Sequence, residues 1–385
     1  MKVKLRNPER LVDVPGPVSV HQMLATLDIN PETVLVIHDG TLVTKDHVLP
    51  DDARVEVRPV ISGGAGPAKC THCKAPSIIE IARHRAAYCA DCFTDHVRAQ
   101  VRDAVRRYDM MSYDDRILVA VSGGKDSLAL WDVLLDMGYR ADGMYLGLGI
   151  GSYSDNSEKI VRDYAEARGA TLHLVDLAGE YGYDIPQATG LKGRSSCGVC
   201  GLSKRYAFNK VALEHGYDVM ATGHNLDDEA AQLLGNVLRW QTPFMARQSP
   251  CLPRSETMAK KVKPLYRLGE REMAAYCVIK GIDYVVEECP MVEGNTVLRY
   301  KDALNELERH SPGTKGQFLF GFLERARPQL FPDGDPEGHR LVDCAECGMP
   351  TTTPPRQEAA GTEPVLCAFC RTRGRILQVV QKAAR

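Results

Sequence analysis

Cysteine is the residue type best placed to do chemistry in this chain, because thirteen of its 385 residues are cysteines. Eight of them form two sets of paired C-x-x-C turns, CTHC with CADC and CAEC with CAFC. Fifteen and nineteen residues separate the turns, a spacing typical of structural zinc ribbons. Four thiolates leave no open coordination position, so each set predicts one structural Zn²⁺, with disulfides as the alternative. The expected zinc ligands are Cys70, Cys73, Cys89 and Cys92 in the first set and Cys344, Cys347, Cys367 and Cys370 in the second.

A third C-x-x-C, formed by Cys197 and Cys200, has no second pair nearby. Cys289, in the segment VVEECPM after the last expected sheet strand, is the nearest further candidate. Three thiolates from two segments suit a [4Fe–4S] cluster in which one iron lacks a protein ligand and can bind an external sulfide. The alternative is a redox pair in which Cys197 or Cys200 carries a persulfide and the other resolves it as a disulfide. Lys204 lies one helical turn after Cys200, where it can donate to a phosphate or to a reacting base.

The stretch RILVAVSGGKDS at 116–127 predicts a phosphate-binding loop. A buried apolar strand stops at a small-residue turn, and the helix that follows has first amides without intrahelical partners. Gly123 and Gly124 allow the backbone to close around an anion, and the helix N-terminus adds positive potential. The spacing of the Walker loop is missing, and an ordinary glycine-rich turn is the alternative. The candidate nucleotide-binding residues are Ala120, Ser122, Gly123, Gly124, Lys125, Asp126 and Ser127, joined from later loops by Leu146, Gly223 and Asp228.

The elements that must position these residues alternate between strand and helix from residue 116 to about 286. This alternation predicts an α/β fold with a doubly wound parallel sheet that is covered on both faces. Ligands of such sheets bind at the carboxyl ends of the strands. We therefore expect Ser122–Ser127, Leu146 and Thr222–Asp228 to converge on one nucleotide site.

Three consecutive acids follow the fourth expected strand, in the stretch TGHNLDDEA. One of Asp227, Asp228 and Glu229 can hold Mg²⁺ near a polyphosphate or polarise a substrate group. The alternative is a run of acids that only stabilises a helix N-terminus.

Residues 1–64 read as a separate unit with the order β-β-α-β-β that ends in Ser62-Gly63-Gly64. This pattern resembles the ubiquitin-like sulfur carriers with a β-grasp fold, whose last glycine is adenylated and converted to a thiocarboxylate. Here the diglycine is internal and runs on into Ala65, so Gly64 has no free carboxylate to activate. Either a protease releases the carrier after Gly64, or the unit is a tethered docking module. A flexible glycine-rich linker after a small β domain is the simpler alternative.

Composition indicates an ordinary globular chain, with 44% hydrophobic and 25% charged residues and a net charge of −2. No apolar run reaches membrane-spanning length and no signal-peptide core is visible, so we expect a soluble cytoplasmic protein without a membrane partner. A near-neutral total can still hide local basic patches. Local basic stretches lie at 192–194, 204–205, 260–263 and 371–375, and Arg98, Arg102 and Arg106 share one helix face for which a solvated role is favoured.

SGGKDS resembles the PP-loop of the ATP-pyrophosphatase family, whose members cut ATP between the α and β phosphates. Combined with C-x-x-C-G…KRY, TGHNLDDEA, a later Cys-Pro and two ribbons, it resembles the tRNA 2-thiouridine synthetases, and CGLSKRYAFN favours the TtuA type. The resemblance covers about residues 67–385. Cys92 departs from it, since relatives can use histidine there, and zinc accepts either.

The resemblance implies ATP-dependent adenylation of the C2 oxygen of a uridine, expected at position 54 of tRNA, followed by its replacement with sulfur. Ser122 and Mg²⁺ would stabilise the transferring phosphate, and Lys204 and Asp228 would orient or polarise the substrate. A carrier-activating enzyme and a cysteine desulfurase would act upstream, and relatives suggest a homodimer. Thiolation of uridine 34 or cytidine 32, a PP-loop ligase for a small molecule, and a non-catalytic RNA-binding adaptor are the alternatives.

The expected domain order has five parts. These are a β-grasp carrier-like domain at 1–64, a linker at 65–69, a zinc ribbon at 70–95, a PP-loop catalytic domain with the iron–sulfur site at 96–330, and a second ribbon with a basic tail at 331–385.

Overall fold

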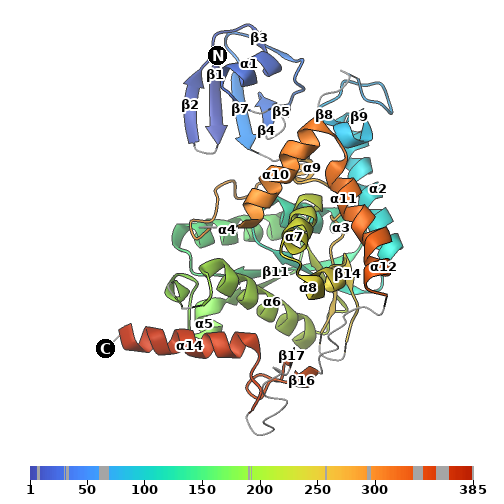
Figure 1. The fold of residues 1–385 in the computed structure, drawn as a ribbon. Helices are drawn as coiled ribbons and strands as arrows, with labels where there is room; N and C mark the ends of the chain where they lie inside the picture. The colour runs from blue at the N-terminus through green and yellow to red at the C-terminus, as the bar shows by residue number, and fades with distance from the viewer. Residues whose placement is uncertain are drawn as a thin grey trace.

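The computed structural model describes most of the chain and shows one central α/β sheet with smaller units around it (Figure 1). The described residues are 1–6, 9–29, 31, 34–59, 69–189, 191, 193–255, 258–292, 296–332, 341–352 and 364–383. The diglycine predicted to end the carrier-like unit, Gly63-Gly64, lies outside the described residues. No described helix combines the length and the apolar character that crossing a membrane requires.

The N-terminal unit is a five-stranded mixed sheet in the order β2-β1-β7-β4-β5, packed against helix α1. β1 pairs antiparallel with β2 and parallel with β7, which confirms the expected hairpin; the short strands β3, β5 and β6 are additions to the expected β-β-α-β-β order. Ser19 caps α1 by accepting from the backbone N–H of Gln22, whose side chain reaches back to the Ser19 amide. The elements are β1 (Lys2–Arg6), β2 (Glu9–Asp13), β3 (Val18–Ser19), α1 (Val20–Thr26), β4 (Val34–His38), β5 (Thr41–Leu42), β6 (Val48–Leu49) and β7 (Arg54–Pro59).

The central sheet has six strands in the order β12-β11-β10-β13-β15-β14. All its pairings are parallel except that of β14 with β15, which confirms the doubly wound expectation and adds an antiparallel edge strand that it did not contain. The chain turns from one half of the sheet to the other between β10 and β13, which is the point where such sheets bind ligands. The strands are β10 (Arg116–Val121), β11 (Arg140–Gly147), β12 (Leu172–Asp176), β13 (Val219–Thr222), β14 (Cys251–Leu252) and β15 (Lys260–Val262).

Helices cover both faces of this sheet, and alternate side chains of β10 enter two different cores. Ile117 and Val119 pack with α3 and α9, whereas Leu118 packs with α6 on the opposite face. Two buried faces explain why the strand reads as a continuous apolar run. The larger helices are α2 (Ala90–Tyr108), α3 (Lys125–Asp136), α4 (Gly151–Arg168), α6 (Ser196–Glu214), α7 (Leu226–Leu238), α9 (Glu270–Lys280), α10 (Thr296–His310) and α11 (Thr314–Gly321). The shorter helical segments are η2 (Ala82–His84), α5 (Leu177–Tyr181), η3 (Pro186–Ala188), α8 (Thr242–Arg247), η4 (Phe322–Ala326) and α12 (Arg327–Leu330).

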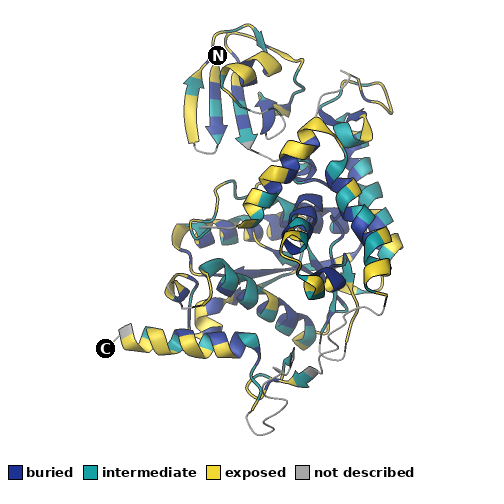
Figure 2. Ribbon diagram, in the orientation of Figure 1, coloured by how far each residue is buried: buried dark blue, intermediate teal, exposed yellow. Residues whose placement is uncertain are grey.

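Each ribbon is a short hairpin followed by a helix. The first has β8 (Ile79–Ile81) and β9 (Ala86–Tyr88) before α2, and the second has β16 (Leu341–Asp343) and β17 (Pro350–Thr352) before α14 (Ala368–Ala383). Figure 1 places the N-terminal unit at one end of the molecule and α14 at the other. Figure 2 shows the central strands buried and exposed residues gathered along α10 and α14.

The N-terminal unit packs against the catalytic domain through β4, β5 and α9. Leu35, Ile37 and Leu42 belong to the same apolar core as α9, and the Arg58 guanidinium lies 5.8 Å from the centre of the Tyr284 ring. This contact places the unit on the α9 face of the central sheet, opposite the face that α6 covers.

Candidate active site

A cavity of about 460 Å³ opens at the carboxyl ends of β10, β11 and β13. Its lining includes nearly all the side chains and glycines that the sequence predicted to meet there. These are Ala120, Ser122, Gly124, Asp126, Ser127, Leu146, Lys204, Gly223 and Asp228. Gly123 and Lys125 were predicted with them but do not line the cavity. The convergence of three strand ends is therefore observed, while the roles of the individual residues stay predictions.

The phosphate loop is closed by its own hydrogen bonds. The backbone N–H of Ser122 donates to Ser127 Oγ at 3.0 Å, and Ser127 Oγ donates to the Gly124 carbonyl at 3.0 Å. Gly123 has φ +78°, and a Cβ there would lie 3.0 Å from the Ser157 carbonyl oxygen. A side chain at 123 would therefore be strained and would collide with α4, so this position requires glycine.

Lys125 turns away from the cavity into an ion pair. Its ammonium lies 2.6 Å from Glu270 Oε1 at the start of α9 and 3.3 Å from Asp126 Oδ2. Burial alone would lower the pKa of Lys125, but these two carboxylates outweigh it and raise the pKa. Lys125 is consequently a fixed cation beneath the loop rather than a side chain exposed in the cavity.

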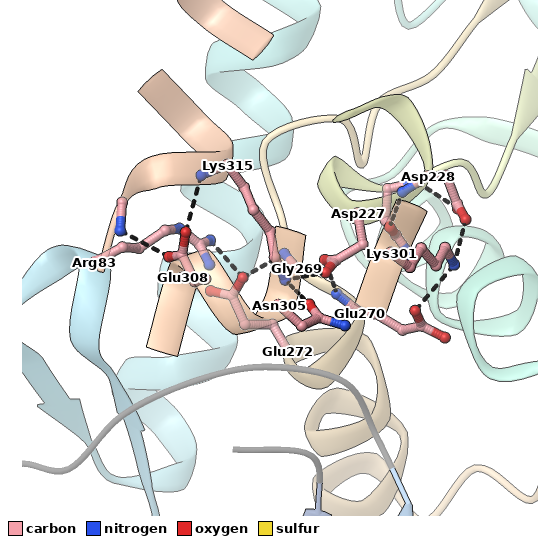
Figure 3. Close-up of polar contacts among 12 residues, drawn as sticks. Arg83, Asp227, Asp228, Gly269, Glu270, Glu272, Lys301, Asn305, Glu308 and Lys315 are labelled. Atoms are coloured by element: carbon pink, nitrogen blue, oxygen red, sulfur yellow. Dashed lines mark hydrogen bonds and ion pairs between the residues drawn. The ribbon is translucent and has the colours of Figure 1, made fainter. Parts of the chain in front are cut away.

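The pair continues into a closed ring of polar contacts, of which Figure 3 shows the part formed by Glu270, Lys301 and Asp228. Glu270 Oε2 lies 3.0 Å from Lys301 Nζ on α10, and Lys301 Nζ lies 2.6 Å from Asp228 Oδ1. The backbone N–H of Asn225 donates to Asp228 Oδ2 at 3.1 Å, and the side-chain Nδ2 of Asn225 donates to Asp126 Oδ1 at 3.0 Å. We name the set Asp126, Lys125, Glu270, Lys301, Asp228 and Asn225 the polar ring.

The charges of the polar ring are strongly coupled. Burial raises the pKa of Glu270, but the Lys125 and Lys301 ammoniums outweigh it and hold that pKa at about 2. Burial raises the pKa of Asp126 to about 6, and the nearby carboxylates of Glu270 and Asp228 add to the rise. The Asp126 carboxyl thus keeps its proton to a higher pH than a solvent-exposed aspartate does.

Only one of the three consecutive acids in TGHNLDDEA faces the cavity. Asp227 is buried, its carboxylate lies 2.5 Å from Lys315 Nζ, and it accepts from the Glu270 backbone N–H at 2.8 Å. Glu229 is buried and pairs with Lys263 at 2.8 Å. Asp228 remains at the cavity, so it is the acid that can polarise a substrate or hold Mg²⁺ there.

Sequence reasoning missed Glu270, Lys301 and Lys315, the partners that hold these acids. A signal was present in α10, where Lys301, Asn305 and Glu308 are buried although the residue types are polar. Their spacing places them on one helix face, and a polar stripe on a buried face requires partners. Those partners lie far away in the sequence, so local spacing does not identify them.

The three isolated cysteines lie beside the cavity but do not line it. Cys197 and Cys200 lie in the first two turns of α6, which Ser195 caps. Cys197 Sγ lies 3.6 Å from the carbonyl oxygen of Met291, in the segment that carries Cys289. That segment follows α9 irregularly, so the strand expected just before Cys289 is absent among the described residues.

Tyr153 connects these thiols to the cavity, which it lines. Tyr153, Cys200 and Cys289 pack against the same apolar cluster, and burial raises the pKa of Tyr153. Gly201, next to Cys200, and Lys204, one turn on, also line the cavity. Three partly buried thiols from two segments beside an open cavity fit the donor set of an iron–sulfur cluster.

Helix α6 is held from behind by the second ribbon. The Tyr206 ring stacks on the Phe369 ring with centroids 3.8 Å apart and an interplanar angle of 5°. Phe369 also meets Tyr181 edge to face at 5.2 Å. The ribbon therefore supports the helix that carries Cys197, Cys200 and Lys204.

Both predicted zinc sets are assembled. In each, the four sulfur atoms lie within 4.8 Å of one another, and among the described residues these are the only groups that close. Burial raises the pKa of Cys70, but backbone N–H groups of Cys73 and Cys89 outweigh it and lower that pKa to about 6, which favours the thiolate. Sulfur ligands at this spacing fit a tetrahedral Zn²⁺.

Three family models match the chain. A PP-loop domain matches residues 94–295, a 2-thiouridine synthetase TtuA N-terminal LIM domain matches 69–94, and the ThiS family matches 3–64. The first match alone spans more than half of the chain.

Relatives of similar length agree with these matches. The chain is 46% identical over 302 residues to the tRNA-5-methyluridine(54) 2-sulfurtransferase of Thermus thermophilus, a match that covers 78% of the chain and 90% of the relative. The protein of the same name from Pyrococcus horikoshii is 40% identical over 303 residues, covering 79% and 93%. The solved structure of the U34-tRNA thiolase NcsA from Methanococcus maripaludis, with its [4Fe-4S] cluster, matches with a TM-score of 0.63 at 24% identity. The match covers 73% of the chain and 92% of the NcsA chain, and it shows a shared fold. The chain therefore belongs to the TtuA-type tRNA 2-thiouridine synthetases of the PP-loop superfamily, with a ThiS-type domain at its N-terminus.

Proposed function

We propose that this protein is an ATP-dependent sulfurtransferase that replaces the C2 oxygen of 5-methyluridine, or uridine, at position 54 of tRNA with sulfur. One observation carries the proposal: the phosphate loop and the cysteine helix line the same cavity. Ser122 and Ser127 form one wall, and Gly201 and Lys204 of α6 form another. Activation by ATP and delivery of sulfur can then take place without moving the substrate.

The first half of the reaction makes the base a better electrophile. The C2 oxygen attacks the α-phosphate of ATP, the bond between the α-phosphorus and the bridging oxygen breaks, and pyrophosphate leaves. The loop amides and the Ser122 hydroxyl stabilise negative charge on the transferring phosphate, and Mg²⁺ beside Asp228 would assist. The polar ring fixes Asp228, so its carboxylate meets the substrate in one orientation.

The second half exchanges oxygen for sulfur. Sulfide attacks C2, the C2–O bond breaks, and AMP leaves with the former carbonyl oxygen. Lys204 lines the cavity and is placed to donate to the departing phosphate or to the base. A [4Fe–4S] cluster held by Cys197, Cys200 and Cys289 would supply an iron without a protein ligand, at which sulfide can bind.

The N-terminal domain is proposed to carry the sulfur after release at Gly64, or, if it stays in cis, to act as a tethered docking module. Hydrolysis of the Gly64–Ala65 peptide bond would free the Gly64 carboxylate, which a carrier-activating enzyme would adenylate and which would then receive sulfur from a cysteine desulfurase. The ThiS family match over residues 3–64 supports this assignment. We further propose that the enzyme acts in the cytoplasm, where its tRNA substrate is found, and as a homodimer, which sedimentation of the purified chain would test.

Nucleoside mass spectrometry of tRNA from cells lacking the gene tests the function. We expect loss of 5-methyl-2-thiouridine, or 2-thiouridine, from the digestion fragment that contains position 54. Loss from position 34 or 32 would reassign the substrate, and unchanged thionucleosides would overturn the proposal. Complementation with Cys197→Ser or Cys289→Ser chains should fail, whereas Cys251→Ser, a cysteine outside both ribbons and the predicted cluster set, should restore the modification.

The carrier role has its own test. Intact mass of the protein from cells shows whether a fragment ends at Gly64. A full-length chain alone, together with undiminished activity of Gly64→Ala, would overturn the carrier role and leave the thiolase assignment intact.

A further inference from the structure

Several cations gather on the α6 side of the cavity without an acidic partner. Lys204 and Arg205 line the cavity, and Arg194 and Lys261 lie close by. Within the described part of the chain, none of these four makes an ion pair. Unpaired cations beside a substrate cavity are available for an anionic ligand.

Arg194 lies two residues before the start of α6, Arg205 lies within the helix, and both side chains approach glycines of its first turns. A Cβ at Gly198 would lie 3.1 Å from Arg194 Cγ, and one at Gly201 would lie 3.3 Å from Arg205 Nη1. Both side chains therefore lie against glycines near the start of α6. The Arg205 guanidinium thus lies beside Gly201, next to Cys200, and the Arg194 side chain lies beside Gly198, next to Cys197.

Strand β15 adds Lys261 from the sheet below. Lys261 is the register partner of Met220 on β13, and Met220 lines the cavity and belongs to the α6 core. Side chains of register partners share a face of the sheet, so Lys261 projects towards α6. Lys260, one residue earlier, pairs with Val219 on the opposite face and donates to the Asp109 carbonyl.

Like charges at this place cost free energy in the unliganded protein. Partial burial lowers the pKa of Arg205, and the charge of Arg194 lowers it further. Burial lowers the pKa of Lys261, and the charge of Arg205 adds to that effect. An anion between these groups would relieve the repulsion, so the site is built for a negatively charged ligand.

The other basic stretches of the sequence are occupied by protein partners. Lys263 pairs with Glu229, Arg98 pairs with Asp136, and Arg373 binds the Tyr181 carbonyl and Glu346. The structure therefore distinguishes the cations without an acidic partner from other lysines and arginines that form protein contacts, although sequence spacing offered no means of telling the two groups apart.

We propose that Arg194, Arg205 and Lys261 bind the phosphodiester groups of the tRNA strand that flank the reacting nucleotide. This inference rests on the proposed function, because it names how that same cavity receives its RNA. The cations lie at the end of the cavity towards α6, whereas the phosphates of ATP belong at the Ser122–Ser127 loop. Arginine forks match phosphate oxygens, and Lys204 inside the cavity is then left for the base.

The neighbouring lysines of β15 offer a matched experiment. The full-length protein is titrated with the tRNA substrate at several salt concentrations, comparing Arg205→Gln and Lys261→Met with the control Lys260→Met. Each test variant should weaken tRNA binding and reduce the slope of log affinity against log salt by about 1. Lys260→Met removes the same charge but should leave that slope unchanged. Arg205→Lys keeps the charge and should keep most of the slope, and zinc content with the unfolding midpoint shows that each chain is folded.

The outcomes separate this inference from the function. If wild type thiolates tRNA while Arg205→Gln and Lys261→Met bind it with the wild-type slope, the phosphodiester site is wrong and the function stands. If the variants lose ATP affinity instead, the cations bind the nucleotide and the proposal is overturned. The phosphodiester proposal is also overturned if Arg205→Gln and Lys261→Met change only the binding of a separately added carrier domain. Failure of wild type to thiolate any tRNA would refute the proposed function instead.

Discussion

Lys301→Met would remove from the polar ring the cation that Asp228 and Glu270 share. The Lys301 side chain is 11% exposed and lies between Asp228 at 2.6 Å and Glu270 at 3.0 Å. Methionine has a similar length and an apolar stem, so it removes the charge while leaving most of the packing. After the change, two carboxylates lose the cation that they share.

The size of the effect follows from burial and from the contacts that remain. Removing one partner of a buried ion pair costs about 3–5 kcal/mol, because the other charge stays buried and unpaired. Asp228 is 27% exposed and keeps the Asn225 amide, and Glu270 keeps Lys125, so both charges are partly compensated. We therefore expect a loss of about 2–3 kcal/mol, a large fraction of the roughly 5–15 kcal/mol that stabilises a typical domain.

The assay combines denaturant unfolding with steady-state thiolation. A free Asp228 carboxylate loses its fixed orientation, so kcat should fall by about 10- to 100-fold while KM for ATP and tRNA changes little. Lys159→Met is the matched control, because Lys159 forms an exposed i,i+4 pair with Asp163 on α4. Such pairs contribute about 0.3–0.5 kcal/mol, so this variant should resemble wild type. Lys301→Arg keeps the charge and should recover part of the loss.

Two results would refute the reasoning. If Lys301→Met unfolds at the wild-type denaturant concentration, the ion pairs contribute no net stability. If it is destabilised but keeps the wild-type kcat, the polar ring stabilises the fold without orienting Asp228.

Three further predictions follow from other parts of the structure. Gly123→Ala forces a side chain into φ +78° against α4, so ATP affinity measured by equilibrium dialysis should fall at least tenfold, and unchanged affinity would contradict the loop geometry. Burial raises the pKa of Glu272, but the charge of Arg83 outweighs it and holds the pKa at about 2. This carboxylate therefore stabilises the fold above pH 4.5, and that stability is lost as the pH falls towards 2. Glu272→Gln should flatten the acid side of a plot of unfolding free energy against pH, and an unaltered acid side would refute the assignment. Phe369→Ala removes the ring stacked on α6 and should lower thiolation while ATP affinity holds, at a cost of about 3–5 kcal/mol to the second ribbon measured by zinc release, whereas the exposed Phe244→Ala should change neither.

Much of the fold and of the chemistry could be predicted from local spacing. Paired C-x-x-C turns bring thiols together whatever surrounds them, so both zinc sets were predictable from sequence distance alone. The strand–glycine–helix pattern at 116–127 likewise predicted the loop, because its geometry depends on Gly123 and on the helix start. Alternating strands and helices predicted the doubly wound sheet and therefore the edge where the loops meet.

Other features depended on which distant segments pack together. Whether an acid of TGHNLDDEA is free or buried is decided by Lys315 and Lys301 on later helices, and no local pattern distinguishes Asp227 from Asp228. The direction of Lys125 depends on Glu270 in the same way.

The sequence by itself determined that ATP chemistry, sulfur chemistry and two zinc ribbons share one chain, because each is recognised from a short motif of residue types at fixed spacing. Only the tertiary structure decided which charged side chains are available to a substrate. Lys260 and Lys261 are neighbours of the same type, yet strand alternation turns one to a protein carbonyl and the other towards the cavity helix. That difference arises because electrostatic partners are chosen in space, after the sheet and its covering helices have formed.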